Sequence, residues 1–295
     1  MRYSERRSAP WLSLHGRRRK VNEMTIAKEI AGFYDTGQEA GRLFQGLGRI
    51  EFARMQELMQ RYLAPLPAVV ADVGGGPGIY AGWLATKGYE VHLSDPVPLH
   101  VQQARQASEK QPSYPLASAE AGDARQLAMP DSSVDAVLLH GPMYHLTEKP
   151  DRLLALAEVR RVLRPGGVLL AVAINSYAST IVGVVNGWVW DPAYMEMIRE
   201  EISTGQHRCP TDWKLFTTSF FHHPDLLKSE IEEAGFQHEL TLGIQGPGWM
   251  APDFEAVWKD DARRQAILQV ARLMEHEPAH SPHMLAVARK PSSDR

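Results

Sequence analysis

The sequence predicts an α/β fold, in which a doubly wound, mostly parallel sheet of seven strands carries helices on both faces. Short apolar runs alternate with helical stretches between residues 69 and 174, and the alternation resumes after residue 224. Strands separated by helices imply right-handed crossovers and therefore a parallel sheet covered on both sides. A glycine-rich turn at residues 74–78, directly after the first strand, lets a ligand approach the backbone closely.

Each expected strand is a short apolar run bounded by turn-forming residues. The strands are expected at residues 69–73, 90–94, 119–122, 134–139, 168–174, 237–244 and 284–288. The helices that connect them are expected at residues 79–87, 98–110, 149–163 and 224–234.

The N-terminal residues divide into a basic segment and a helical one. Residues 1–23 carry seven Lys and Arg side chains against two Glu, a charge of +5, which leaves −8 for the rest of the chain. Such a basic run can contact nucleic acid or an acidic surface, but a disordered tail is the favoured interpretation. Residues 24–66 are expected to form N-terminal helices, because apolar residues recur at three- and four-residue spacing until Pro65 and Pro67.

Two segments interrupt the alternation, at residues 175–221 and 245–282. We expect them to form a cap over one end of the sheet, because they are rich in tryptophan. Five of the seven tryptophans lie there: Trp188, Trp190, Trp213, Trp249 and Trp258.

The composition excludes several classes of protein. Cys209 is the only cysteine, so an intrachain disulfide and a Cys-rich zinc site are excluded and a reducing, cytoplasmic compartment is expected. No apolar run reaches the 18 or so residues of a membrane-spanning helix, so no membrane crossing is expected.

The glycine-rich turn predicts a cofactor that contains adenosine. Gly74, Gly76 and Gly78 follow a buried strand in a G-x-G-x-G pattern, two residues after Asp72. Asp95 ends the next strand about 20 residues later, where an acidic residue can accept hydrogen bonds from a ribose. A turn aspartate before Pro96 is the simpler alternative. Dinucleotide enzymes place a G-x-G-x-x-G turn at the same point, so the glycines alone leave the cofactor open.

Four motifs in order resemble the class I S-adenosylmethionine-dependent methyltransferases, in particular those that act on small molecules. They lie at residues 71–78, 93–95, 122–130 and 163–167, the last reading Leu-Arg-Pro-Gly-Gly. The resemblance implies S-adenosylmethionine as cofactor, a Rossmann-like fold and a methyltransferase domain over residues 67–290.

The resemblance also implies a role for each matching residue. The three glycines would line the methionine portion of the cofactor, and Asp72 would order the turn or meet its ammonium group through water. Asp95 would hold the ribose and Asp123 the adenine, while Arg42 would pair with the cofactor carboxylate. An ordinary helix surface is the alternative for Tyr34 and Arg42. The implied cofactor-binding residues are Tyr34, Arg42, Asp72, Gly74, Gly76, Gly78, Asp95, Pro96, Asp123, Ala124 and His140.

The segment after the fourth strand is the expected catalytic region, since ligands bind at the carboxyl ends of such strands. Tyr144 and His145 are the candidates near the transferred methyl group, with His145 as general base. The alternative is that this segment only caps and packs the next helix. Candidate acceptor-binding residues are Tyr144, His145, Trp188, His207, Arg208, His222, His223 and Trp249. The tryptophans could equally form the core of the cap. No metal site is expected, because the histidines lack ligand spacing.

Methyl transfer by in-line displacement to a flat, for example heteroaromatic, small molecule is therefore the first hypothesis. An RNA or protein acceptor is a second one, although the charge of −8 beyond residue 23 disfavours nucleic acid. A nicotinamide-dependent oxidoreductase and a cofactor-binding regulator without turnover are hypotheses of other classes. The acceptor, the methylated atom, the use of a base and the oligomeric state, monomer or homodimer, stay open.

Overall fold

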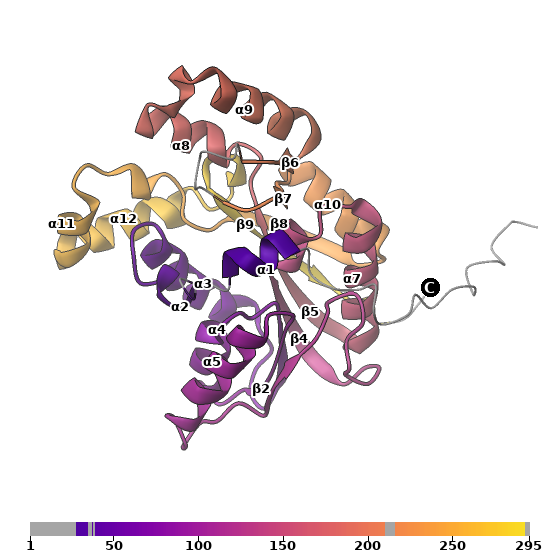
Figure 1. Cartoon of the computed structure of the whole chain (residues 1–295). Helices are drawn as coiled ribbons and strands as arrows, with labels where there is room; N and C mark the ends of the chain where they lie inside the picture. The colour runs from indigo at the N-terminus through magenta and orange to yellow at the C-terminus, as the bar shows by residue number, and fades with distance from the viewer. Residues whose placement is uncertain (1–27, 35–36, 38, 210–215, 293–295) are drawn as a thin grey trace, which may run out of the picture.

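A computed structural model describes residues 28–34, 37, 39–209 and 216–292 and confirms the predicted fold class. Seven strands form one sheet in the order β3-β2-β1-β4-β5-β9-β8 (Figure 1). The first five are parallel, and β9 runs antiparallel to both of its neighbours. The expected basic tail and Trp213 lie outside the described residues.

The strands lie close to their expected positions. They span Val69–Val73 (β1), Glu90–Asp95 (β2), Ser118–Ala121 (β3), Val134–His140 (β4), Leu163–Ile174 (β5), Gln237–Gly243 (β8) and His283–Arg289 (β9). The start of β5 differs from the expectation, because Leu163 already pairs with Val134. Val168 then pairs with Ala136, so the four residues between Leu163 and Val168 bulge out of the ladder.

Helices cover both faces of the sheet. One face is packed by α3 (Gly48–Tyr62), α4 (Ile79–Thr86) and α5 (Pro98–Glu109), whose apolar residues share a core with Val70 and Leu138. The other is packed by α7 (Lys149–Val162) and α10 (Pro224–Glu233). Successive strand residues point to opposite faces, so Ala71 and Val137 belong to the second core. The side chains of these four strand residues are fully buried. Packing on both faces therefore holds the strands in place, and with them the polar residues at the strand ends.

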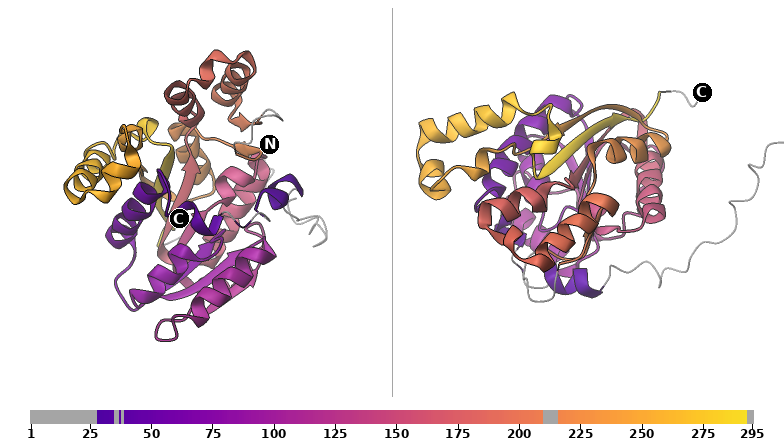
Figure 2. Two further views of the ribbon diagram at one scale, coloured as in Figure 1. Left: turned by 60° about the vertical axis from the view of Figure 1, so that its left-hand side comes forward. Right: turned by 90° about the horizontal axis from the view of Figure 1, so that it is seen from above.

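The segments between β5 and β8 and between β8 and β9 form two separate groups of helices (Figure 2). The first contains α8 (Ala178–Asn186), α9 (Pro192–Thr204) and the short strands β6 (Gln206–His207) and β7 (Ser219–Phe220), and it stands at the top of Figure 1. The second contains α11 (Phe254–Lys259) and α12 (Asp261–Leu273) and lies beside α3. The elements therefore do not form one continuous cap.

Candidate active site

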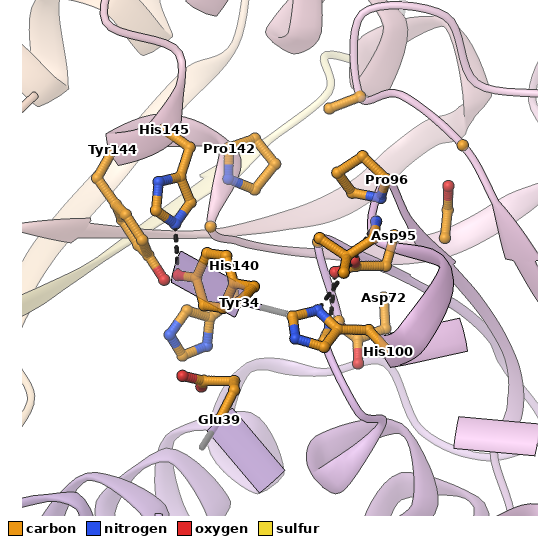
Figure 3. Close-up of a pocket in the computed structure, with 18 of the residues that line it drawn as sticks. Tyr34, Glu39, Asp72, Asp95, Pro96, His100, His140, Pro142, Tyr144 and His145 are labelled. Atoms are coloured by element: carbon orange, nitrogen blue, oxygen red, sulfur yellow. Dashed lines mark hydrogen bonds and ion pairs between the residues drawn. The ribbon is translucent and has the colours of Figure 1, made fainter. Parts of the chain in front are cut away.

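A cavity opens at the carboxyl ends of β1, β2 and β4 (Figure 3). Its walls come from the glycine turn, the end of β2, residues 122–125 after β3, and α6 (Pro142–His145) after β4. Two short N-terminal helices, α1 (Lys28–Tyr34) and α2 (Glu39–Arg42), contribute Tyr34, Glu39 and Arg42. Ten of the eleven expected cofactor-binding residues line this cavity, and Gly78 is the exception.

The glycine turn needs residues without side chains for two different reasons. A Cβ atom on Gly74 would lie 2.6 Å from the carbonyl oxygen of His140, so the end of β1 and the end of β4 approach closely. Gly78 has a positive φ of 81° before α4, and its Cβ would lie 2.9 Å from the Cβ of Ala104. Gly78 therefore allows α4 and α5 to pack together and does not face the cavity.

Asp95 joins the second strand to the glycine turn. One carboxylate oxygen accepts a hydrogen bond from the Gly76 N–H (2.8 Å), and the other accepts one from the Val97 N–H (2.9 Å). The same second oxygen lies 3.1 Å from Nδ1 of His100, which the sequence analysis did not single out. His100 lines the cavity and is 2% exposed, and its Nε2 has no hydrogen-bond partner among the described residues.

Asp72 is fully buried, yet neither of its carboxylate oxygens makes a well-formed hydrogen bond within the described part of the chain. Burial raises its pKa to about 7, the nearby Asp95 acts in the same direction, and the backbone N–H of Ala81 acts against both. A buried carboxylate without a partner is unfavourable unless a ligand supplies one. Asp72 lines the cavity, so a cation bound there would restore its ionised form.

Asp123 and Ala124 follow β3 and line the cavity, as expected. Arg125 donates hydrogen bonds to both oxygens of Asp123 (3.0 and 2.7 Å) and bridges to Asp151 (2.9 Å). This arrangement fixes the orientation of the Asp123 carboxylate. Oδ1 also accepts a hydrogen bond from the backbone N–H of Arg125 (2.8 Å), so the lone pair left for a further donor is on Oδ2.

Arg42 is arranged differently from the expectation. Its Nη1 and Nη2 atoms donate to the two oxygens of Glu51 (2.8 and 3.0 Å), and its Nε donates to Glu39 (2.7 Å). Glu51 is fully buried on α3 and was missed by the sequence analysis, because an acidic residue in the first turn of a helix normally faces solvent. Pairing with Arg42 holds the pKa of the Glu51 carboxyl well below its ordinary value, against the effect of burial.

His140 and Tyr80 extend this buried network toward the cavity. The two rings are stacked with centroids 5.4 Å apart, and Nε2 of His140 lies 3.6 Å from Glu51. Burial lowers the pKa of His140 to about 3, so its imidazole is neutral. The expectation for His140 concerned its backbone carbonyl, which faces Gly74 at the cavity edge.

Tyr34 and His145 are in direct contact inside the cavity. The Tyr34 hydroxyl lies 2.6 Å from Nε2 of His145, although the two residues are 111 positions apart in the sequence. Burial lowers the pKa of His145 to about 3, with smaller effects of His100 and His140, and burial raises the pKa of Tyr34 well above its ordinary value. Both groups are therefore neutral, and one hydrogen bond joins them. The ring of Tyr144 packs edge-on against His145, with centroids 4.6 Å apart.

Comparison with known proteins agrees with this geometry. Residues 71–171 match the family described as "Methyltransferase domain", which covers about a third of the chain. The chain contains a class I S-adenosylmethionine-dependent methyltransferase domain. A ubiquinone/menaquinone biosynthesis C-methyltransferase of Acidiphilium cryptum is 33% identical over 51% of this chain and 57% of its own length. The chain thus spans little more than half of that relative.

Two further similarities extend beyond the matched residues of the methyltransferase domain. A ubiquinone biosynthesis O-methyltransferase of Cereibacter sphaeroides is 26% identical over 78% of this chain and 79% of its own length. The crystal structure of an S-adenosylmethionine-dependent methyltransferase of Methanosarcina mazei superposes with a TM-score of 0.55 at 16% identity, covering 80% of this chain and 98% of that one. The similarity to the Methanosarcina mazei structure concerns the fold alone, because the sequence identity is only 16%.

The charges of the cavity fit the cofactor of this methyltransferase family. Five carboxylates line it, against the two guanidinium groups of Arg42 and Arg125. S-adenosylmethionine carries an ammonium and a sulfonium cation beside one carboxylate, so an acidic cavity with an unpaired Asp72 suits it. The five carboxylates belong to Glu39, Asp72, Asp95, Asp123 and Asp151.

Of the eight expected acceptor-binding residues, only Tyr144 and His145 line the cavity of the methyltransferase domain. Trp188 packs against Tyr194 at the base of α9, and Trp249 packs against the core formed by α3 and α12. The described tryptophans Trp188 and Trp249 therefore pack within the helical groups, which was the alternative interpretation.

The other expected acceptor-binding residues also have partners of their own. His207 is buried, stacks on Phe221 with centroids 4.5 Å apart, and contacts Glu201 through Nδ1 (2.7 Å). His222 is buried against Glu230 (3.2 Å). His223 is exposed and accepts a hydrogen bond from the Asp225 N–H at the start of α10, and Arg208 is exposed near Glu200. None of these four lines the cavity.

The described residues contain neither a metal-binding cluster nor a membrane-spanning helix. No group of three or more His, Cys, Asp or Glu side chains in this part of the chain is arranged to hold a metal ion. Within the same residues, no helix has the length and apolar character that spanning a membrane requires.

Proposed function

We propose that this protein transfers a methyl group from S-adenosylmethionine to a small-molecule acceptor by in-line displacement. The observation that carries the proposal is the acidic cavity at the glycine turn, in which Asp72 is buried without a cationic partner among the described residues. Methyl transfer from a sulfonium needs the acceptor atom to be held close to the methyl carbon and aligned with it. The walls formed by Tyr34, Tyr144 and His145 would supply this alignment.

Each part of the cavity would take a defined part of the cofactor. The backbone at Gly74 and Gly76 would face the methionine portion, and Asp72 would bind its ammonium group. Asp95, with Pro96 beside it, would accept from the ribose, and Asp123 and Ala124 would contact the adenine. Arg42 would reach the cofactor carboxylate only through N–H groups that Glu39 and Glu51 do not use. The sulfonium supplies the methyl group to be transferred.

The charge of the cavity argues against a nicotinamide dinucleotide. A pyrophosphate carries two negative charges, and it would face Asp72, Asp95 and three further carboxylates. Dinucleotide sites place the pyrophosphate at a helix N-terminus without such a cluster. A cofactor-binding regulator without turnover would bind S-adenosylmethionine in the same cavity but form no methylated product.

A flat acceptor is favoured over a polymer. Tyr34, Tyr80 and Tyr144 line the cavity. Phe216 is not a lining residue but packs on two residues that are, with its ring centroid 6.1 Å from that of Tyr144 and 5.8 Å from that of His145. Aromatic walls suit an aromatic acceptor. Two relatives are named for ubiquinone biosynthesis, as a C-methyltransferase and an O-methyltransferase. A cytoplasmic location, expected from the single cysteine, is part of this proposal.

The proposal is tested by incubating the purified protein with methyl-labelled S-adenosylmethionine and a metabolite extract, followed by mass spectrometry. We expect a labelled small molecule in the presence of the wild-type protein. Asp72→Asn should lose most of the product, whereas Asp225→Asn, which changes an exposed carboxylate on α10, should not. Tight cofactor binding without any labelled product would support the regulator, and label in RNA or protein alone would replace the small-molecule acceptor.

A further inference from the structure

We propose that Tyr34 and His145 together accept the proton of the methyl acceptor, and that this acceptor is consequently a phenol methylated on its oxygen. The inference rests on the proposed function and names the substrate class of the same site. It goes beyond the sequence analysis, which left both the methylated atom and the use of a base open.

The geometry of the pair supports a proton relay. The hydroxyl oxygen of Tyr34 lies 2.6 Å from Nε2 of His145, and both residues line the cavity (Figure 3). The proposed relay uses the tautomer in which this hydroxyl donates to Nε2. A hydroxyl that donates to a strong acceptor becomes a better acceptor itself, because hydrogen bonds in a chain polarise one another. The oxygen of Tyr34 can thus accept a hydrogen bond from a bound hydroxyl group while its own proton points at His145.

Other side chains hold the pair in place. The ring of Tyr34 packs edge-on against His100, with centroids 5.1 Å apart, and His100 is in turn bound to Asp95. Phe216 and Tyr144 pack on the other side, against His145. A continuous row of contacting side chains therefore runs from Asp95 through His100 and Tyr34 to His145.

The proton balance of methyl transfer explains how a neutral, buried histidine can serve as the base. The acceptor oxygen forms a bond to the methyl carbon while the carbon–sulfur bond breaks and leaves its electron pair on sulfur. The proton of the acceptor passes to the oxygen of Tyr34, and the proton of Tyr34 passes to Nε2 of His145. One positive charge disappears at sulfur as another appears on the imidazole, so the net charge of the cavity does not change.

The electrostatics of the cavity make this exchange favourable in one direction. Before transfer, the sulfonium opposes protonation of His145. After transfer, the sulfur is neutral and this opposition is gone. His145 is therefore a weak base in the substrate complex and a better one as the methyl group leaves sulfur.

An acceptor with a weakly acidic hydroxyl on an aromatic ring fits these features best. The hydroxyl of a phenol can hydrogen-bond to Tyr34 and bring its oxygen directly to the proton acceptor, whereas an aliphatic amine would reach the site already protonated. The ring would pack against Tyr34 and Tyr144, which both line the cavity.

The pair itself is tested without cofactor or acceptor. In ¹⁵N-histidine-labelled protein we expect Nε2 of His145 to be unprotonated and hydrogen-bonded at neutral pH, and its resonance to shift in Tyr34→Phe. A proton on Nε2 of His145 would overturn the proposal, because that tautomer cannot accept from Tyr34. The distant His276→Gln variant assigns a control resonance, since its side chain is 71% exposed.

The chemistry is tested with ¹³C-methyl S-adenosylmethionine, the metabolite extract and catechol as a probe. The ¹³C shift of the product methyl group distinguishes attachment to oxygen from attachment to carbon, nitrogen or sulfur. We expect an aromatic O-methyl product, and methylation of another atom would overturn the assignment. Failure of the wild type to bind S-adenosylhomocysteine would instead remove the proposed function itself.

Kinetics separate a proton relay from a structural role. We expect Tyr34→Phe and His145→Gln each to lower kcat roughly 10²- to 10⁴-fold, with KM and S-adenosylhomocysteine affinity changed little. The double variant should lose no more than the worse single variant, because the two groups act as a unit. Additive losses, or losses in KM and cofactor affinity alone, would overturn the relay. Tyr114→Phe, an exposed tyrosine outside the cavity, is the matched control.

Discussion

Arg42 and Glu51 form a bidentate ion pair that connects the N-terminal helices to the cofactor cavity. Glu51 is fully buried, while the Arg42 side chain is 32% exposed and lines the cavity. Glu51 also lies 3.6 Å from His140 on β4 and 3.5 Å from His283 on β9. One carboxylate therefore holds together α2, α3 and two strands at the side of the site.

Glu51→Gln tests the importance of this pair. The variant keeps the side-chain volume but leaves Arg42 without its charged partner, and breaking a buried ion pair costs about 3–5 kcal/mol. We expect a loss of this order in the free energy of unfolding, measured by urea denaturation, and weaker binding of S-adenosylhomocysteine. Glu255→Gln removes the exposed ion pair with Arg49 and should cost at most about 1 kcal/mol. Equal losses in the two variants would contradict the assigned role.

Asp72 predicts a pH-dependent affinity for the cofactor. Its pKa is raised to about 7 by burial and by Asp95. An ammonium group binds the ionised carboxylate, so the affinity for S-adenosylhomocysteine should rise as the pH increases from about 6 to 8 and then level off. Asp72→Asn should bind weakly with a flat profile over this range. Calorimetric titration at several pH values measures both, and a flat wild-type profile would contradict the prediction.

The same residue predicts the opposite pH dependence for stability without ligand. A raised pKa in the folded state means that the protonated carboxyl of Asp72 favours folding. This contribution is complete below the ordinary pKa of 3.8 and is lost as the pH rises through about 7. Relative to Asp72→Asn, the ligand-free wild type should become less stable between pH 5 and pH 8 in urea unfolding. If the wild type instead became more stable relative to Asp72→Asn as the pH rises, the ionised carboxylate would lie in a favourable environment and the prediction would be wrong.

His100 predicts a cofactor contact that the family motifs do not include. Its Nε2 is buried at the cavity and lacks a partner among the described residues. His100→Leu should weaken S-adenosylhomocysteine binding by about 0.5–1.5 kcal/mol, the usual net value of one hydrogen bond. His92→Gln is the control, because His92 lies on β2, the strand that carries Asp95, but does not line the cavity. This variant should bind S-adenosylhomocysteine as the wild type does. Unchanged calorimetric affinity in His100→Leu would limit His100 to orienting Asp95.

Two glycines of the same turn predict unequal effects. Gly74→Ala would place a Cβ 2.6 Å from the His140 carbonyl oxygen and from Pro142, so the two strand ends would have to separate. Gly76→Ala meets nothing closer than 3.9 Å and costs only the strain of its positive φ, about 1–2 kcal/mol. Gly74→Ala should thus lose far more cofactor affinity and stability. Urea unfolding and calorimetry compare them, and similar losses would contradict the close approach.

The part of the site that the sequence could predict depends on local pattern. The glycine turn, Asp95 and Asp123 each follow a strand directly, so their positions are determined by the same periodicity that predicts the sheet. Parallel strands then bring their carboxyl ends to one edge. The fold and most cofactor-facing residues are consequences of these short-range signals.

The remaining residues depend on contacts between distant segments, which no single pattern encodes. Glu51 faces inward because Arg42, His140 and His283 surround it, and they come from three other elements. His100 reaches Asp95 from the first turn of α5, where one histidine carries no distinctive signal. The contact of Tyr34 with His145 spans 111 positions. Trp188 and Trp249 pack inside the helical groups, whereas Trp190 is 83% exposed, so a tryptophan-rich segment did not by itself indicate residues that face the cavity.

Calorimetric titration of the full chain with S-adenosylhomocysteine, and separately with NADH, tests the central claim most directly. The acidic cavity with its unpaired Asp72 predicts saturable binding of S-adenosylhomocysteine that is weakened in Asp72→Asn, and no binding of NADH. Binding of NADH without S-adenosylhomocysteine would contradict the account.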